Sequence, residues 1–320
     1  MMKNSPPIIG HETQIAELQS NIDTGNIAHA YLFSGPRSLG KMTVARWFAR
    51  SLLLQGAEAM RDDTIRQIDH LVHPDLLVLD QLWIEGVSED WHVIGRSSNI
   101  PQEHRSKIPK AKTDTISIDD IRAIQGRLHE TGGRYRCCII RSIERMQEPA
   151  ANALLKMLEE PPEGLVFLLT TEQRSLLLPT VVSRVRLLPF FPVSPVLLRP
   201  LLQEIPSEDH QFCLHVAQGA PGVLQRFRMG KSALQEQRLL RTQAFSFFPA
   251  RPSERQRILE RFAERRQELH FLLLHMALAL QELRPPTFLR WSHAFPSFVQ
   301  NLDAHVNYVL AVQQFVLTDS

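Results

Sequence analysis

The sequence has few of the features that mark secreted, membrane-bound or metal-stabilised proteins. Only three cysteines are present, and Cys137 and Cys138 are adjacent, so the pattern predicts neither a disulfide framework nor a C-x-x-C metal site. No apolar run approaches the ~18–20 residues of a membrane span, and the amino terminus has no signal-peptide core. A net charge of +2 does not by itself indicate nucleic-acid binding. These absences predict a soluble cytoplasmic protein.

The chain is long enough for several domains. With 320 residues, 43% of them hydrophobic and 22% charged, it has the composition of an ordinary globular protein of two or three domains. In the first part of the chain short apolar runs alternate with helical patterns, which predicts a parallel sheet with crossover helices. Strands are predicted at 29–35, 75–83, 134–142, 164–171 and the end of 176–190, and helices at 41–56, 117–130 and 149–160.

The pattern changes near Pro189, after which only helical periods occur. We therefore expect three domains: an α/β domain over residues 1–190, a small helical lid over 191–230 and a helical bundle over 231–320. The apolar faces of the bundle, which include Leu272, Leu273, Met276 and Leu280, exceed what one helix can bury by itself. We therefore expect the bundle to pack against the corresponding bundles of other subunits.

The segment FSGPRSLGKMTVARWFA, residues 33–49, nearly matches the phosphate-binding loop G-x-x-x-x-G-K-[ST]. Gly35, Gly40 and Lys41 occupy the positions that cradle phosphate oxygens and reach the outer phosphates. Met42 stands where a Ser or Thr hydroxyl would hold Mg²⁺, and a thioether has no affinity for that hard cation. The sequence therefore predicts weak ATP or ADP binding at most, with no bound metal and no required cofactor.

The order of elements, a P-loop followed by a small helical unit and a helical tail, resembles an AAA+ ATPase module. That resemblance implies an Asp-Glu pair directly after the apolar strand RCCII, where it holds Mg²⁺ and orients the attacking water. This chain has Arg141 and Ser142 there, and Glu144 lies two residues further on. Because the losses at Met42 and at Arg141–Ser142 affect the same reaction, we expect no ATP hydrolysis in cis.

Several motifs in order make the resemblance more specific: HAYLFSGPRSLGK, HPD (73–75), ISIDDIRAI, NALLKMLEEPPEGLVFLLTT and LLPTVVSRV. With AQGAPGVLQR (217–226) and the tail at 298–317, they resemble the delta prime subunits of bacterial DNA polymerase III clamp loaders over nearly the whole chain. The resemblance implies a subunit that does not hydrolyse ATP and supports loading of the sliding clamp onto primed DNA. The implied partners are the gamma/tau ATPase subunits, the delta subunit and, through the complex, the sliding clamp and primer-template DNA, with no membrane involved.

The resemblance also assigns a role to Arg184. In clamp loaders an S-R-C motif at this place supplies an arginine to the nucleotide of the neighbouring subunit, and this chain has Ser183, Arg184 and Val185. An arginine donated in trans stabilises charge on the transferred phosphoryl group and is worth ~10³–10⁵ in rate. Val185 replaces a cysteine without changing that charge. We expect Arg184 to be an arginine finger.

Two departures from the family have consequences. Gln55–Val72 contains no cysteine, so the four-cysteine zinc knuckle of many members is missing and no zinc is expected; His70 and His73 alone do not make a zinc site. The stretch Glu85–Thr115 is longer than the usual connection and is predicted to be a long loop. Its basic residues either face solvent or contact phosphates: Arg105, Lys107, Lys110 and Lys112.

Other interpretations stay open. An active gamma/tau-type ATPase needs a hydroxyl after Lys41 and an acidic strand end after Ile140, and only a shifted loop would bring Thr43 into the first role. An AAA+-shaped scaffold without a replication role is opposed by Arg184 and by the family-like tail. An accidental G-x-x-x-x-G-K match is disfavoured because the further motifs follow it in order.

Overall fold

The computed structural model describes residues 8–55, 61–80, 98–99, 115–128, 133–263, 266–283, 288–303 and 307–317. The predicted long loop at 85–115, with its basic residues Arg105, Lys107, Lys110 and Lys112, lies outside these ranges except for residues 98, 99 and 115. The chain divides into two compact units, Met1–Pro200 with Gly219–Gly222 and Leu201–Gln218 with Val223–Ser320. The division into three domains at residues 190 and 230 stays a prediction.

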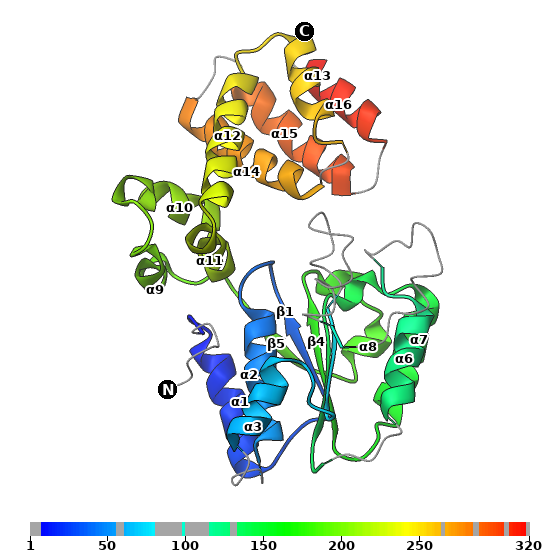
Figure 1. Ribbon diagram of the computed structural model, residues 1–320. Coiled ribbons are helices and arrows are strands. Elements are labelled where there is room, and N and C mark those ends of the chain that lie inside the picture. Colours follow the sequence, from blue (N-terminus) through cyan, green and yellow to red (C-terminus); the bar gives the residue numbers. More distant parts are fainter. Residues whose placement is uncertain are drawn as a thin grey trace. The chain divides into compact units, whose positions relative to one another are not determined.

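A five-stranded, all-parallel sheet forms the centre of the first unit (Figure 1). The strands stand in the order β2 (Leu76–Leu79), β3 (Arg136–Ile140), β4 (Leu165–Thr171), β1 (Ala30–Ser34) and β5 (Arg186–Pro189). Every residue of β2, β3 and β4 is buried, whereas β5 at the edge is largely exposed. Continuous burial is typical of a parallel sheet covered on both faces. The predicted α/β architecture is confirmed.

Helices cover both faces of this sheet (Figure 1). One face carries α1 (Glu12–Thr24), α2 (Lys41–Leu53) and α3 (Arg61–Asp69), and the other carries α6 (Ile118–Leu128) and α7 (Glu148–Glu159). The predicted inward face of α2 is buried at Val44, Ala45, Phe48 and Leu52. Residues of α6 and α7 join those of the strands in one apolar core, including Ile121, Ile124, Leu154 and Leu158. This packing holds the strands in position, and with them the predicted site residues at the strand ends.

The elements end close to the predicted limits, and two helices had not been predicted. Helix α2 ends at Leu53 and β2 at Leu79, earlier than the patterns suggested, while α1 and α3 add two further helices to the first unit. Shorter elements complete it: η3 (Ile143–Arg145), η4 (Arg174–Leu176), α8 (Pro179–Val182) and α9 (Pro195–Leu198). The short helix η5 (Arg199–Leu202) spans the boundary between the two units. Proline at the head of α7 and α8 starts both helices, because its missing N–H is not needed in the first turn.

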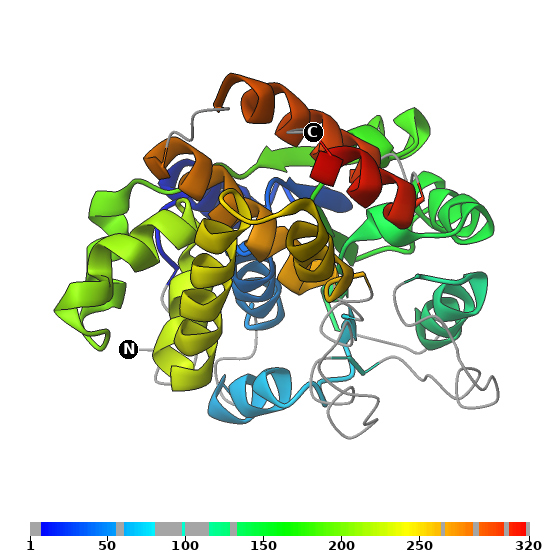
Figure 2. The same ribbon diagram turned by 90° about the horizontal axis from the view of Figure 1, so that it is seen from above.

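In the rest of the chain, the described elements are all helices. The elements are η6 (Ser207–Asp209), α10 (His210–Ala217), α11 (Pro221–Met229), α12 (Lys231–Phe247), α13 (Pro252–Glu260), α14 (Arg266–Leu283), α15 (Phe288–Asp303) and α16 (Tyr308–Val316). Helices α12 and α14 pack side by side, as Figures 1 and 2 show, and α16 packs against α13 and α15. None of the helices in the described ranges combines the length and hydropathy that a membrane span requires.

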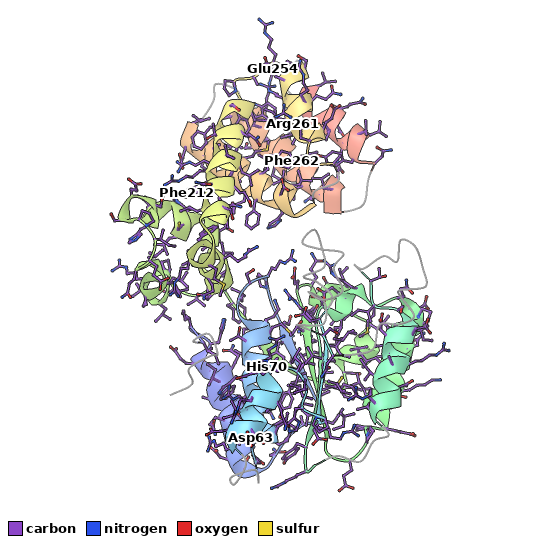
Figure 3. The ribbon with its side chains drawn as sticks, viewed as in Figure 1. Asp63, His70, Phe212, Glu254, Arg261 and Phe262 are labelled. Atoms are coloured by element: carbon purple, nitrogen blue, oxygen red, sulfur yellow. The ribbon has the colours of Figure 1, made fainter. Side chains whose placement is uncertain are left out.

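An aromatic core holds α12 to α16 together. Trp291 is fully buried, with its ring 5.4 Å from that of Phe248 and 5.2 Å from that of Phe315, and the Arg255 guanidinium lies 4.7 Å above it. Phe262, labelled in Figure 3, belongs to the same core. Stacked and edge-to-face rings of this kind add to the hydrophobic effect of burial. Trp291 is thus the centre of this core.

The sequence-based argument for packing of the bundle against other subunits was wrong in its choice of residues. Leu272, Met276 and Leu280 are buried inside the chain's own bundle, and Leu273 packs against the same core. Their apolar surface is therefore already covered by neighbouring helices of this chain. The large side chains that remain exposed on the last helices are different ones, and they include Leu289, Val309, Leu310 and Leu317.

Replacing Trp291 by Ala should lower the free energy of unfolding of this bundle by about 3–5 kcal/mol, because truncation leaves a cavity among the aromatic rings. Urea unfolding followed by circular dichroism at 222 nm measures the effect. Leu289→Ala on the same helix is the matched control: Leu289 is 74% exposed, so the change should stay within about 0.5 kcal/mol. Equal losses in the two variants would contradict the assignment of Trp291 to the core.

Candidate functional site

The parallel register places chemically active residues at one edge of the sheet. Ser34, the last residue of β1, is level with Thr171 of β4 and Pro189 of β5, and Leu79 of β2 is level with Ile140 of β3. The residues that follow these strands therefore share the carboxyl edge. In open α/β sheets ligands bind at this edge. It carries the glycine-rich loop after β1, Asp80 after β2, Arg141 after β3 and Glu172 after β4.

The glycine-rich loop has the backbone conformation that its glycines permit. Gly35 has φ of 149°, and a Cβ atom there would lie 2.2 Å from the carbonyl oxygen of Phe190. Gly40, the N-cap of α2, has φ of 95°. Both positions are strongly unfavourable for other residues. The loop leads directly into the amino terminus of α2, where Lys41 is the first helical residue, as in phosphate-binding loops.

Three contacts hold this loop in place. His11 Nε2 lies 2.9 Å from the carbonyl oxygen of Leu39. Burial lowers the pKa of His11, which favours the neutral ring as the donor at neutral pH. The backbone N–H of Gly222 donates to the carbonyl oxygen of Ser38 at 2.9 Å, and that of Gly35 donates to Thr171 at 3.2 Å. These hydrogen bonds with other parts of the protein fix the conformation of the loop.

Lys41 is buried, and its ammonium group bonds to the loop itself. Nζ donates to the carbonyl oxygens of Gly35 and, at 2.6 Å, of Pro36. Burial lowers the pKa of Lys41 to about 8, against the opposing effect of the Glu172 and Glu144 carboxylates. A lysine ammonium has three N–H donors, so these two carbonyl contacts leave one donor for an outer phosphate.

An ion pair occupies the place where a metal-binding acid is expected. Nη1 of Arg141 lies 3.0 Å from Oδ1 of Asp80, whose side chain is buried, and 3.3 Å from its Oδ2. The Asp80 carboxylate therefore faces a guanidinium and not an open metal position. A fixed cation there also repels Mg²⁺. Met42, in the first turn of α2, offers no oxygen ligand in place of the missing hydroxyl.

The charges around Lys41 balance each other. Arg37, Arg141 and Lys41 are the cations, and Asp80, Glu144 and Glu172 are the carboxylates; Nε of Arg37 lies 3.6 Å from Oε1 of Glu172. Oε1 of Glu144 accepts the N–H of Glu172 at 3.1 Å. Within the described ranges, no group of three or more His, Cys, Asp or Glu residues is arranged to hold a metal ion. Among the described residues of this edge, these carboxylates do not outnumber the cations, so they give no surplus of negative charge for a divalent cation.

Arg184 lies at the other edge of the sheet. It precedes β5, and Arg186, the first residue of β5, is level with Tyr31, four residues before Gly35. Four residues of strand correspond to about 13 Å, so Arg184 lies at least that far from the chain's own loop along the strands. Val185 packs against the core of the sheet and anchors the segment. The structure thus brings Gly35, Gly40 and Lys41 together and separates Arg184 from them.

Sequence reasoning missed Asp80, Glu172 and Arg37. Arg37 lies inside the loop, and the two acids directly follow the apolar runs of β2 and β4, which was the available signal, because parallel strands bring their carboxyl ends together. The neighbouring strand β2 supplies a carboxylate, Asp80, beside the end of β3, and the Arg141 guanidinium pairs with it. The roles predicted for Arg184 and for the loop residues stay predictions.

Comparison with known proteins identifies relatives of this chain. The family described as DNA polymerase III, delta subunit matches residues 10–194. The gamma/tau subunit of Mycobacterium tuberculosis is 33% identical over 63% of this chain and 31% of its own length. The delta prime subunits of Bacillus subtilis and Pseudomonas aeruginosa are each 31% identical, over 60% and 62% of this chain and 51% and 55% of their own lengths. The matches therefore span between a third and about half of these relatives.

Among solved structures, a DNA polymerase III gamma-subunit-related protein of Thermotoga maritima aligns over 93% of this chain and 97% of its own, with a TM-score of 0.48 and 18% identity. The family match covers more than half of the chain and includes the glycine-rich loop, Arg141 and Arg184. The chain belongs to the DNA polymerase III delta-subunit family.

Proposed function

We propose that this chain is a non-hydrolysing subunit of a bacterial clamp loader that donates Arg184 to the nucleotide of a neighbouring ATPase subunit. In this proposal its partners are gamma/tau-type and delta subunits, and through them the sliding clamp and primer-template DNA. The family match and the named relatives support a role in DNA polymerase III. The assignment as a non-hydrolysing subunit that donates Arg184 rests on the chemistry of the two edges of the sheet.

The observation that carries the proposal is the position of Arg184. The arginine lies at the amino edge of the sheet, whereas the glycine-rich loop lies at the carboxyl edge, so Arg184 is out of reach of any phosphate on its own chain. The guanidinium is partly exposed, which leaves it open to another molecule. A planar fork of donors suits phosphate oxygens. A cation in this place is therefore suited to act on a neighbour's nucleotide.

An active gamma/tau-type ATPase is the second candidate, because identity to gamma/tau subunits is as high as identity to delta prime subunits. Hydrolysis would require Mg²⁺ beside the terminal phosphates and an acid that orients water. Met42 supplies no such ligand, and the buried carboxylate that follows β2, Asp80, is paired with Arg141. The physical argument therefore favours the non-hydrolysing assignment.

The proposal includes an assignment of the helical parts. We assign residues 191–230 to a lid and 231–320 to a collar that joins the subunits. The exposed apolar side chains of the last helices are the surface offered to a neighbouring collar: Leu289, Val309, Leu310 and Leu317. Contact with a neighbouring collar would cover such exposed apolar side chains.

The purified protein should show no ATP turnover above background, because the described residues around the loop offer no ligand set for Mg²⁺. Phosphate release measured over several hours, with the Lys41→Ala variant purified in parallel, tests this expectation. Turnover that is present in the wild type and lost in Lys41→Ala would contradict it, since a contaminating ATPase would persist in both preparations.

Binding of ATP should be weak, nearly independent of Mg²⁺ and stronger below pH 8 than above it. Phosphate binds the charged form of Lys41, whose pKa of about 8 in the free protein means that the ammonium is lost as the pH rises through that value. Titration with a fluorescent ATP analogue at pH 7 and pH 9, with and without Mg²⁺, measures both effects. A strong Mg²⁺ requirement would instead point to Thr43 or Glu144 as a metal ligand.

Arg184→Ala should leave the protein folded and able to assemble, because its partly exposed side chain contributes little to the core. In the reconstituted complex most of the ATPase activity of the one adjacent site should be lost, since an arginine finger is worth about 10³–10⁵ in rate. Sites served by other subunits should continue, so total turnover falls only in part while clamp loading falls further.

Arg184→Lys is the control for charge alone. A lysine keeps the positive charge but cannot reproduce the guanidinium fork, so rescue should be incomplete. If Arg184→Ala left both hydrolysis and clamp loading unchanged, the finger assignment would be wrong and the scaffold interpretation would remain.

A further inference from the structure

The guanidinium of Arg184 is held by its own chain. Nη2 lies 2.8 Å from Oε1 of Glu159, and Nη1 donates to the carbonyl oxygen of Thr180 at 3.0 Å and to the hydroxyl of Ser183 at 3.3 Å. Both ends of the fork are therefore engaged at once. In this arrangement both terminal nitrogens of the guanidinium already contact groups of the same chain.

The carboxylate comes from a different element than the arginine. Glu159 is the last residue of α7, and Arg184 follows α8; the two helices are in contact and lie side by side in Figure 1. The Arg184 and Glu159 side chains are 36% and 49% exposed. A pair with this exposure can open without disturbing the core, because neither side chain is needed to fill it.

We propose that Glu159 is a latch for the arginine finger: its carboxylate keeps Arg184 folded back on α8 until the phosphates of a neighbouring subunit's nucleotide compete for the guanidinium. This inference rests on the proposed function, which makes Arg184 a finger. It assigns to Glu159 the role of a positioning residue that acts through Arg184 and does not touch the nucleotide.

The direction of the effect follows from electrostatics. A phosphate that binds both terminal nitrogens of Arg184 competes with the Glu159 carboxylate for Nη2. A triphosphate carries more charge than a single carboxylate and so displaces it, but the freed Glu159 carboxylate then repels the same phosphates. The Glu159 carboxylate therefore opposes the binding of Arg184 to the phosphates both before and after the phosphates displace it. Because exposed ion pairs are weak, we expect Glu159 to lower the population of Arg184 bound to the neighbour's phosphates by about two- to fivefold.

Glu160 provides a matched control. It follows Glu159 directly at the end of α7, has the same charge and is also exposed, but it takes no part in the ion pair with Arg184. Glu159→Gln and Glu160→Gln remove the same charge from neighbouring positions. Any general effect of a lost negative charge appears in both variants, and an effect on the latch appears only in the first.

The first measurement uses the isolated protein and needs no partner. Phenylglyoxal modifies accessible arginines, and mass spectrometry of the digested protein gives the rate at Arg184. Glu159→Gln should raise that rate about two- to fivefold, because an arginine paired with a carboxylate is less reactive, and Glu160→Gln should leave it unchanged. Equal rates in wild type and Glu159→Gln would overturn the latch, whatever Arg184 does in the complex.

The second measurement uses the complex reconstituted with its ATPase and delta subunits. Glu159→Gln should raise ATP turnover at the adjacent site up to fivefold, and Glu159→Gln combined with Arg184→Ala should behave like Arg184→Ala alone. If Glu159→Gln lowered turnover, Glu159 would support the active position of the finger, and the latch would be wrong. If Arg184→Ala alone had no effect, the finger assignment itself would fail, an outcome distinct from an unchanged phenylglyoxal rate.

Discussion

The parallel direction of five strands is the constraint on which the rest of this structure depends. Because every strand runs the same way, the carboxyl ends form one edge and the amino ends another, and residues far apart in the chain are gathered by edge. The glycine-rich loop, Asp80, Arg141 and Glu172 lie on the first edge, and Glu159 and Arg184 lie toward the second. The chemistry of each edge can therefore differ.

The carboxyl edge carries the glycine-rich loop and an ion pair at the ends of the neighbouring strands. The loop is fixed by backbone contacts, and Lys41 points back to the loop's own carbonyl oxygens. The pair of Arg141 and Asp80 replaces what would otherwise be an open carboxylate at the strand ends. The Asp80 carboxylate is buried, so leaving it without the Arg141 guanidinium would cost several kcal/mol. These contacts support the proposal that the loop edge does not hydrolyse ATP and that Arg184, at the other edge, acts on the nucleotide of a neighbouring subunit.

Local signals allowed most of the first unit to be predicted. The apolar runs of β1, β3 and β4, the helix of Lys41–Leu53 and the degenerate loop were all visible in the sequence. What could not be predicted depends on neighbours that meet only in the fold. The partner of Arg141 is 61 residues away at Asp80, and Glu159 meets Arg184 only because α7 packs against α8. The buried state of Leu272 and Met276 likewise depends on which helices surround α14.

The central claim is that this chain serves a neighbour's nucleotide and does not turn over its own. The most direct test is the ATP turnover of the reconstituted clamp loader when Lys41 of this chain alone is replaced by Ala. The account predicts wild-type turnover, because Lys41 belongs to a loop that contributes no hydrolysis. A loss of turnover in Lys41→Ala, with assembly of the complex intact, would contradict it and would identify this loop as a working ATPase site.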